Sequence, residues 1–224
     1  LARGKIPILV GGTGLYVDSL LSGRTFAAQA TGWRERLQRR AEAEGILPLL
    51  EELRSVDPEA AARLHPADEK RILRALEVWH ETGKTITQHN RETQSLPPRY
   101  DALVLGLSFE NREHLKRRID LRVDEMMARG LADEVRALLD SGIPSHCTAM
   151  QAIGYKELAA ALLRGEPLSP AVEEIKLRSR QYAKRQLTWF RRMPNIQWLL
   201  WPETPDFSKA LQTATAFAKG FGLV

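Results

Sequence analysis

The chain has 224 residues, and its 33 lysines and arginines outnumber its 28 aspartates and glutamates by five. This length suits one large domain or two modest ones, and a composition of 43% hydrophobic and 27% charged residues excludes a disordered chain. The single cysteine excludes a disulfide framework and a cysteine-rich zinc site, and it fits a reducing compartment. No apolar run approaches the ~18 residues of a membrane span, so we expect a cytoplasmic chain. Its first residue, Leu1, is compatible with a processed or truncated piece.

A strand, a glycine turn and a helix are predicted at the start of the chain. Residues 6–10 resemble a short buried strand, residues 11–16 are rich in glycine, and a helix is expected over 16–21. This order is typical of a parallel α/β sheet, in which ligands bind at the carboxyl ends of the strands. Residues 102–107 and 196–200 are predicted to add two further strands.

The remaining segments are predicted to be helical. Asp57 and Pro58 have the residue types of an N-cap followed by the first helical position, and Gly83 that of a C-cap. From residue 26 to about residue 98 strand character is missing, and the segment ends in a polar stretch, 88–98. We interpret it as an all-helical insertion into the α/β unit. The predicted helices span residues 33–44, 47–54, 68–82, 112–128, 131–139, 156–164, 170–190 and 207–219.

Basic residues are concentrated between positions 176 and 192, where no acidic residue occurs. With +5 on the whole chain and +7 in this segment, the rest of the chain carries −2. On a helix the cations form two arcs with an apolar face between them, as expected for an element that faces a polyanion. A solvated surface helix is the alternative, although the absence of acids favours nucleic acid. The seven residues are Lys176, Arg178, Arg180, Lys184, Arg185, Arg191 and Arg192.

Two further features indicate anion binding, each with a structural alternative. Residues 11–14, Gly-Gly-Thr-Gly, would place backbone N–H groups and the Thr13 hydroxyl at a helix start, but the glycines can equally serve a tight turn and close packing. Arg122 shares a predicted helix face with Leu115, Ile119 and Met126, so its guanidinium needs an acceptor there. That acceptor is either a carboxylate of this protein or a ligand.

Other fragments carry weaker signals. In the segment 150–156, Tyr155 could stack on a base and Gln151 could read a base edge, whereas Gly154 as a hinge is the structural alternative. Lys70, Arg71 and Arg74 lie on one side of a predicted helix, which is usually a solvated face. Residues 83–85 are not a P-loop, because Val78 stands where the motif requires glycine. The five histidines lack metal-ligand spacing.

Taken together, these segments resemble the tRNA dimethylallyltransferase (tRNA isopentenyltransferase) family. The matching strings are PILVGGTGLYVDSLLSG, VDPEAAARLHPADEKRILRALEV, RRIDLRVDEMMARGLADEV, AIGYKEL and RQYAKRQLTWFR. They occur in the order of the family and extend from residue 6 to residue 198. The resemblance implies a P-loop-NTPase-like α/β core with a parallel sheet, formed by residues 1–25 and 99–224 and N-terminally incomplete. It also implies a helical insertion domain, 26–98, that binds the tRNA anticodon arm.

The resemblance also implies a reaction. A dimethylallyl group is transferred from dimethylallyl diphosphate to the exocyclic amine of the adenosine 3′ of the anticodon, in tRNAs that read U-starting codons. The target adenine is flipped into a channel, an aspartate acts as general base, and Mg²⁺ with P-loop backbone groups holds the leaving diphosphate. The partners are the tRNA anticodon stem-loop and dimethylallyl diphosphate, no membrane is involved, and members of the family are usually monomers.

Site residues follow from the resemblance position by position. Arg122 corresponds to a channel arginine near the adenine and the diphosphate, and Thr13 to a channel residue near the tRNA. Arg180, Lys184 and Arg185 are expected to bind phosphates of the tRNA or of the donor, and no residue of this sequence is assigned to a metal. The expected tRNA-binding residues are Arg34, Lys70, Arg71, Ile72, Leu73, Arg74, Gln151, Ala152, Ile153, Gly154, Tyr155 and Lys156.

One departure from the family is expected to matter. Family members begin with a strand, a P-loop and a segment with the catalytic aspartate, and none of these precedes Leu1. We therefore expect this chain alone to bind tRNA weakly and not to transfer prenyl groups. The alternative is a non-catalytic RNA-binding remnant of such an enzyme. A related transferase that acts on free adenine nucleotides is disfavoured, because a mononucleotide needs neither the helical insertion nor the acid-free basic helix.

Overall fold

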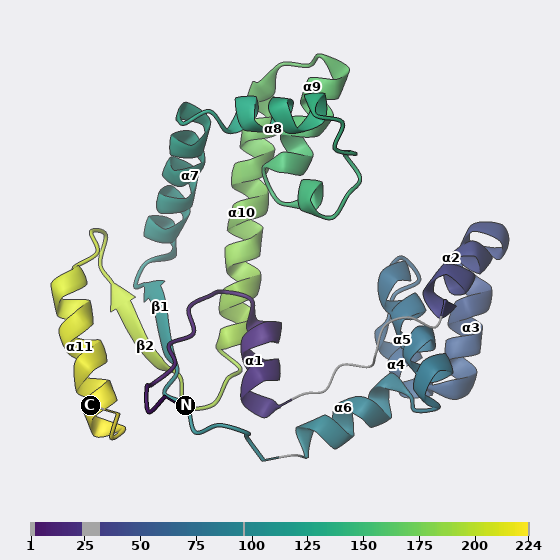
Figure 1. Cartoon of the computed structure of the whole chain (residues 1–224), viewed down its shortest axis with the longest axis horizontal. Helices are drawn as coiled ribbons and strands as arrows, with labels where there is room; N and C mark the ends of the chain where they lie inside the picture. Colours follow the sequence, from purple (N-terminus) through teal and green to yellow (C-terminus); the bar gives the residue numbers. More distant parts are fainter. Residues whose placement is uncertain (1–2, 24–31, 96, 224) are drawn as a thin grey trace. The chain divides into compact units, whose positions relative to one another are not determined.

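The computed structural model describes residues 3–23, 32–95 and 97–223, and it divides into two compact units. Unit 1 consists of Leu1–Gly14 and Leu103–Val224, and unit 2 consists of Leu15–Ala102. Figure 1 shows the elements of both units along the chain. Within the described ranges, no helix is long and apolar enough to cross a membrane.

Unit 2 is built from helices that pack around a leucine-rich core. The core side chains recur at spacings of three or four residues, so that they lie on one face of each amphipathic helix. They include Leu37, Leu49, Leu53, Ile72 and Leu76, each fully buried. The helices around this core are α2 (Trp33–Glu44), α3 (Ile46–Val56), α4 (Pro58–Arg63), α5 (Glu69–Thr82) and α6 (Ile86–Gln94). A further helix, α1 (Gly14–Ser22), begins in unit 1 and precedes them along the chain.

Caps set the ends of these helices as the sequence predicts. The Asp57 carboxylate accepts a hydrogen bond from the backbone N–H of Ala60, and Pro58 is the first residue of α4. Gly83 ends α5 with φ 70°, a left-handed conformation that glycine adopts without steric cost. Asp57 also accepts hydrogen bonds from the N–H and hydroxyl of Thr87. This buried carboxylate thereby joins the start of α4 to the start of α6.

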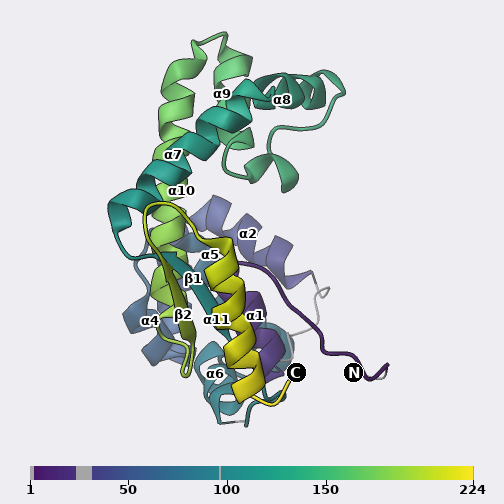
Figure 2. The same cartoon turned by 90° about the vertical axis from the view of Figure 1, so that its left-hand side faces the viewer.

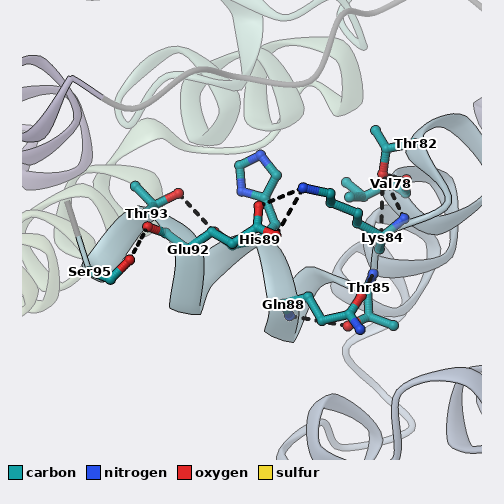
Figure 3. A network of polar contacts seen from close by, with 9 residues as sticks. All are labelled: Val78, Thr82, Lys84, Thr85, Gln88, His89, Glu92, Thr93 and Ser95. Atoms are coloured by element: carbon teal, nitrogen blue, oxygen red, sulfur yellow. Dashed lines mark hydrogen bonds and ion pairs between the residues drawn. The ribbon is translucent and has the colours of Figure 1, made fainter.

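Part of the polar stretch 88–98 is helical, which the sequence did not predict. A capping box starts α6: the Thr85 hydroxyl accepts from the Gln88 N–H, and the Gln88 side chain accepts from the Thr85 N–H (Figure 3). One residue earlier, Lys84 donates to both carboxylate oxygens of Glu92 at 2.9 and 2.8 Å. Lys84 thereby forms an exposed ion pair with α6.

Unit 1 contains a two-stranded parallel sheet, so the predicted α/β class is confirmed. β1 (Leu105–Phe109) pairs with β2 (Gln197–Trp201) in register, from Leu105 opposite Gln197 to Phe109 opposite Trp201. α11 (Phe207–Gly220) packs beside β2, as Figures 1 and 2 both show. The Trp201 ring makes edge contacts with Phe109 and Phe207, which joins strand β1, strand β2 and helix α11.

The second hydrophobic core lies in unit 1 and is formed by four helices. α7 (Arg112–Ala128) and α10 (Leu168–Phe190) lie side by side, with α8 (Leu131–Asp140) and α9 (Tyr155–Arg164) packed at one end of the pair (Figure 2). A short 3₁₀ turn, η1 (Ala149–Gln151), precedes α9. The core side chains are Val123, Val135, Met150, Leu158, Ala159 and Ile175.

The predicted strand over residues 6–10 is wrong. Within the described ranges, the two strands pair with each other, and residues 6–10 have no strand conformation. Ile8 and Val10 are 86% and 89% exposed. A strand requires a neighbouring strand for its backbone hydrogen bonds, and an apolar run alone does not provide one.

Candidate functional site

The basic run, residues 176–192, lies on α10 and just beyond its end. Among the described residues, its first cations are paired with carboxylates, and its later cations are not. Lys176 contacts Asp124 at 2.8 Å, and Arg178 contacts Glu174 at 2.5 Å. One guanidinium nitrogen of Arg180 lies 2.5 and 2.7 Å from the two carboxylate oxygens of Asp120. These three cations are neutralised by acids of α7 and of the first turns of α10, so they add little to the positive potential of the surface.

The second half of the run keeps its cations available. In the described ranges, neither Lys184, Arg185, Arg191 nor Arg192 has a carboxylate partner, and all four are exposed. The Arg185 guanidinium lies 5.8 Å from the centroid of the Tyr182 ring, a cation–π contact that orients it without cancelling its charge. An open pocket of about 460 Å³ is lined by Gln181, Lys184, Arg185, Thr188, Trp189 and Arg192.

The glycine turn packs directly on this part of α10. The Gln186 side chain donates to the Gly12 carbonyl at 2.9 Å, and a Cβ at Gly12 would lie 2.1 Å from its Nε2. A Cβ at Gly14 would lie 2.1 Å from Cδ1 of Trp189, which also lines the pocket. Close packing against the Trp189 ring thus requires Gly14, as the structural alternative for this turn expected, whereas at Gly12 the flexible end of Gln186 could shift.

Thr13 lies between these two contacts and is exposed. α1 begins at the next residue, so the backbone N–H groups of its first turn lack helical partners. The turn, the N-terminal residue of α1 and the unpaired cations of α10 all belong to unit 1. Together they form a surface suited to phosphate groups, which we call the α10 phosphate surface: Thr13, Lys184, Arg185, Thr188 and Arg192.

The position of Arg122 differs from the sequence-based prediction. The buried face of α7 runs through Val123, 2% exposed, and Met127, whereas Arg122 is exposed. Consecutive residues of a helix are rotated by about 100° about its axis. The face predicted from Leu115, Ile119 and Met126 was therefore adjacent to the face that packs on the core. Arg122 therefore needs no acceptor for burial, and it has no ion-pair partner within the described ranges. It remains available to a ligand.

The loop before α9 is held by structural contacts. Tyr155 is partly buried against the second core, and its hydroxyl donates to Glu134, which raises the pKa of the phenol. Gln151 donates to the Ser145 carbonyl at 3.1 Å, and Gly154 adopts φ 102° at the start of α9. Gly154 thus takes a left-handed φ at the turn into α9, and the Tyr155 ring is packed on one side against the second core. Ala152, Ile153 and Lys156 are on or beside this hinge, and Ile153 is 37% exposed.

In unit 2 the predicted tRNA-binding segment on α5 has an inner and an outer side. The Ile72 side chain is fully buried in the leucine core, whereas Leu73 is partly buried against that core. Lys70 and Arg71 are exposed, and Arg71 pairs with Asp68 at 3.0 Å. Arg74 and Arg34 both contact Glu77, a buried residue that sequence reasoning missed.

Side chains of the types that bind metal ions are not clustered in the described part of the chain. No group of three or more histidine, cysteine, aspartate or glutamate side chains that could hold a metal ion occurs in the described residues.

A glycine turn packed on a helix that presents cations without a carboxylate partner among the described residues, in a unit that also holds two parallel strands, defines an α/β protein with a basic surface. The model of the family described as IPP transferase matches residues 1–193, and the chain belongs to this family. The resemblance inferred from the sequence is thus confirmed.

Relatives and a solved structure agree with this assignment. The chain is 48% identical over 198 residues to a tRNA dimethylallyltransferase of Bacillus subtilis, covering 88% of this chain and 62% of the relative. It is 44% identical over 202 residues to that of Natranaerobius thermophilus, covering 89% of this chain and 60% of the relative. A crystal structure of a eukaryotic dimethylallyltransferase acting on tRNA matches 98% of this chain and 57% of its own, with a TM-score of 0.75 and 30% identity. The chain thus spans about six tenths of the length of these curated relatives.

Proposed function

We propose that this chain supplies the tRNA-binding and channel residues of a tRNA dimethylallyltransferase. The reaction is transfer of a dimethylallyl group from dimethylallyl diphosphate to the exocyclic amine of the adenosine 3′ of the anticodon, in tRNAs that read U-starting codons. The observation that carries the proposal is the match of 88–89% of this chain to two proteins named for that activity. The protein is further expected to be monomeric and to act in the cytoplasm.

The α10 phosphate surface supports this function in unit 1. The reaction brings together a diphosphate leaving group and a polyanionic RNA, so it needs cations that are not neutralised by neighbouring carboxylates. Lys184, Arg185 and Arg192 meet that requirement in the described ranges. Their charge favours binding of phosphate oxygens and stabilises the negative charge that develops on the departing diphosphate.

Arg122 and Thr13 are proposed to act in the channel. A planar guanidinium can bind two phosphate oxygens at once, or it can contact a diphosphate and the adenine together. Arg122 is exposed and unpaired among the described residues, so such a contact breaks no internal ion pair. Magnesium is expected for the reaction from the resemblance to the family.

A chimeric enzyme tests the proposal. This chain would replace the 62% of the Bacillus subtilis relative that it matches, and tRNA from cells lacking the native enzyme would be analysed by mass spectrometry for dimethylallyladenosine. We expect modification of the adenosine 3′ of the anticodon. A folded chimera that binds tRNA and leaves the adenosine unmodified would contradict the proposal and favour a non-catalytic RNA-binding protein.

The same chimera tests Arg122. Arg122→Ala is expected to reduce transfer at least about a hundredfold, as loss of a group that stabilises developing charge does, while tRNA affinity changes little. Equal losses of transfer and affinity would show that Arg122 serves binding alone.

A further inference from the structure

A buried carboxylate in unit 2 contacts two arginines from different helices. The Glu77 side chain on α5 is only 5% exposed, and its Oε2 lies 2.8 Å from Nη1 of Arg74 and 3.5 Å from Nη2 of Arg34. Arg74 is on the same helix, whereas Arg34 is in the first turn of α2. A buried glutamate is costly unless it is paired, so these contacts are strongly favoured.

Both arginines keep much of their surface in solvent. The Arg34 side chain is 56% exposed and the Arg74 side chain 31% exposed. A guanidinium has five N–H donors, so one contact to Glu77 leaves donors on each arginine for a second acceptor. Lys70 is one helical turn before Arg74, is exposed, and has no carboxylate partner within the described ranges. Three cations and one carboxylate leave these four side chains with a net charge of +2.

The first turn of α2 is fixed to α5 by a second contact. The Trp33 ring stacks on His80 with centroids 4.0 Å apart and an angle of 9° between the planes. His80 in turn contacts Glu52 at 2.9 Å, so the stack is anchored to α3 as well. Because Trp33 precedes Arg34 directly, the backbone that carries Arg34 is held in place. The position of its guanidinium relative to Arg74 is then set by Glu77.

We propose that Glu77 is a positioning residue that holds Arg34 and Arg74 as a fork for a phosphate group of the RNA backbone, with Lys70 beside it. This inference rests on the proposed function, since it takes tRNA as the ligand. Preorganised guanidinium pairs bind phosphate better than mobile ones, because less side-chain freedom is lost on binding. The net charge of +2 on these four side chains favours an anionic phosphate over a neutral base.

The substitution Glu77→Gln distinguishes a positioning role of Glu77 from an effect of net charge on RNA binding. It removes a negative charge from the unit, so general electrostatic attraction predicts tighter RNA binding by the variant. The fork predicts the opposite result: the affinity of the whole chain for an anticodon stem-loop falls about tenfold, as for loss of charged hydrogen bonds. Glu51→Gln is the matched control, because Glu51 is a glutamate of the same unit that is 65% exposed and, among the described residues, is paired with Arg54 alone. Its affinity is expected to stay equal or to rise slightly.

Two further measurements keep the proposal testable. Adding Arg34→Ala to Glu77→Gln should weaken binding much less than Arg34→Ala does alone, because both changes disrupt one unit. If Glu77→Gln fails to fold, Arg34→Lys preserves the charge but loses the planar donor set, and it should weaken binding several-fold. Binding by Glu77→Gln that matches or exceeds that of Glu51→Gln, or unchanged binding by Arg34→Lys, would overturn the fork.

The outcome also separates this inference from the proposed function. If the unsubstituted chain showed no preference for a stem-loop over a duplex, the tRNA function would be in question. The comparison of Glu77→Gln with Glu51→Gln could then be repeated with whichever RNA binds, and the fork would be supported or overturned by that result.

Discussion

Arg180 of α10 is bound to Asp120 of α7, with one guanidinium nitrogen 2.5 and 2.7 Å from the two carboxylate oxygens. Both side chains are about one third exposed, so the pair joins two helices at the edge of the second core. It marks a division of the basic run by pairing: Lys176, Arg178 and Arg180 contact carboxylates, and the cations after Arg180 have no carboxylate partner among the described residues.

The first prediction compares Arg180 with Lys184. Arg180→Ala should lower the free energy of unfolding by about 1 kcal/mol and leave the salt dependence of RNA binding nearly unchanged. Lys184→Ala should leave stability unchanged, weaken RNA binding similarly for all loop sequences, and reduce the salt slope by about one unit. Thermal unfolding and binding titrations across a salt series measure both effects. A reduced slope for Arg180→Ala would show that it binds phosphate despite Asp120.

The second prediction concerns the glycine turn. Gly14→Ala would place its Cβ 2.1 Å from Cδ1 of Trp189, so α1 or the indole must shift. We expect a loss of about 1–3 kcal/mol of stability, the usual cost of an added group in a packed contact. Gly11→Ala is the control, because no atom lies within 4 Å of a Cβ there. Denaturant unfolding should separate the two variants, and equal stabilities would refute close packing at Gly14.

The third prediction tests the orientation of α7. Arg122→Ala should change stability by less than about 0.5 kcal/mol, as for other exposed sites. Val123→Ala, one residue further and 2% exposed, should cost at least about 1 kcal/mol by leaving a cavity. The reverse order of the two effects in denaturant unfolding would restore the helix face first predicted from the sequence.

The fourth prediction concerns Asp57 and pH. Burial alone would raise the pKa of this carboxyl group, but hydrogen bonds from Thr87 and Ala60 outweigh burial, and the pKa lies below its ordinary value of 3.8. A group whose pKa is lower in the folded state stabilises the fold while it is ionised. This contribution is therefore present above the ordinary pKa and is lost as the pH falls through the lowered value.

Thermal unfolding of Asp57→Asn as a function of pH measures this contribution. The variant should be less stable than the unsubstituted chain near neutral pH, by about 1–2 kcal/mol for a capping residue. This difference in stability should shrink as the pH falls below about 4, because the Asp57 carboxyl group of the unsubstituted chain becomes protonated as the pH falls through its lowered pKa. A difference that stays constant from pH 7 into the acid range would contradict this account.

Local sequence patterns predicted helices well because their determinants lie within a few residues. α2 and α7 begin and end where periodicity and composition placed them, and the caps at Asp57 and Gly83 formed as expected. Features that depend on distant residues were not predictable. The partners of Arg180 and Lys176 lie on α7, more than fifty positions earlier, and the strand predicted over 6–10 required a neighbour that a local pattern does not specify.

The candidate site shows the same limit. The glycines near Gly12 were recognised from sequence, but their contacts with Gln186 and Trp189 link positions about 175 residues apart. Glu77 had no signal at all, because a charged residue within an amphipathic helix is normally read as solvated. Arg34 lies in the first turn of α2, and Arg74 lies one turn before Glu77 on α5. Arginines at such positions are too common to indicate that they share a buried partner.

The most direct test of the account is equilibrium binding of this chain to an anticodon stem-loop with adenosine 3′ of the anticodon, compared with a duplex of equal length across a salt series. We predict a preference for the stem-loop that persists as salt rises, since contacts from unit 2 and from the α9 loop add to the phosphate contacts of α10. Equal affinities for both RNAs that fall together with salt would contradict the account, because the basic helix would then bind RNA without recognising its loop.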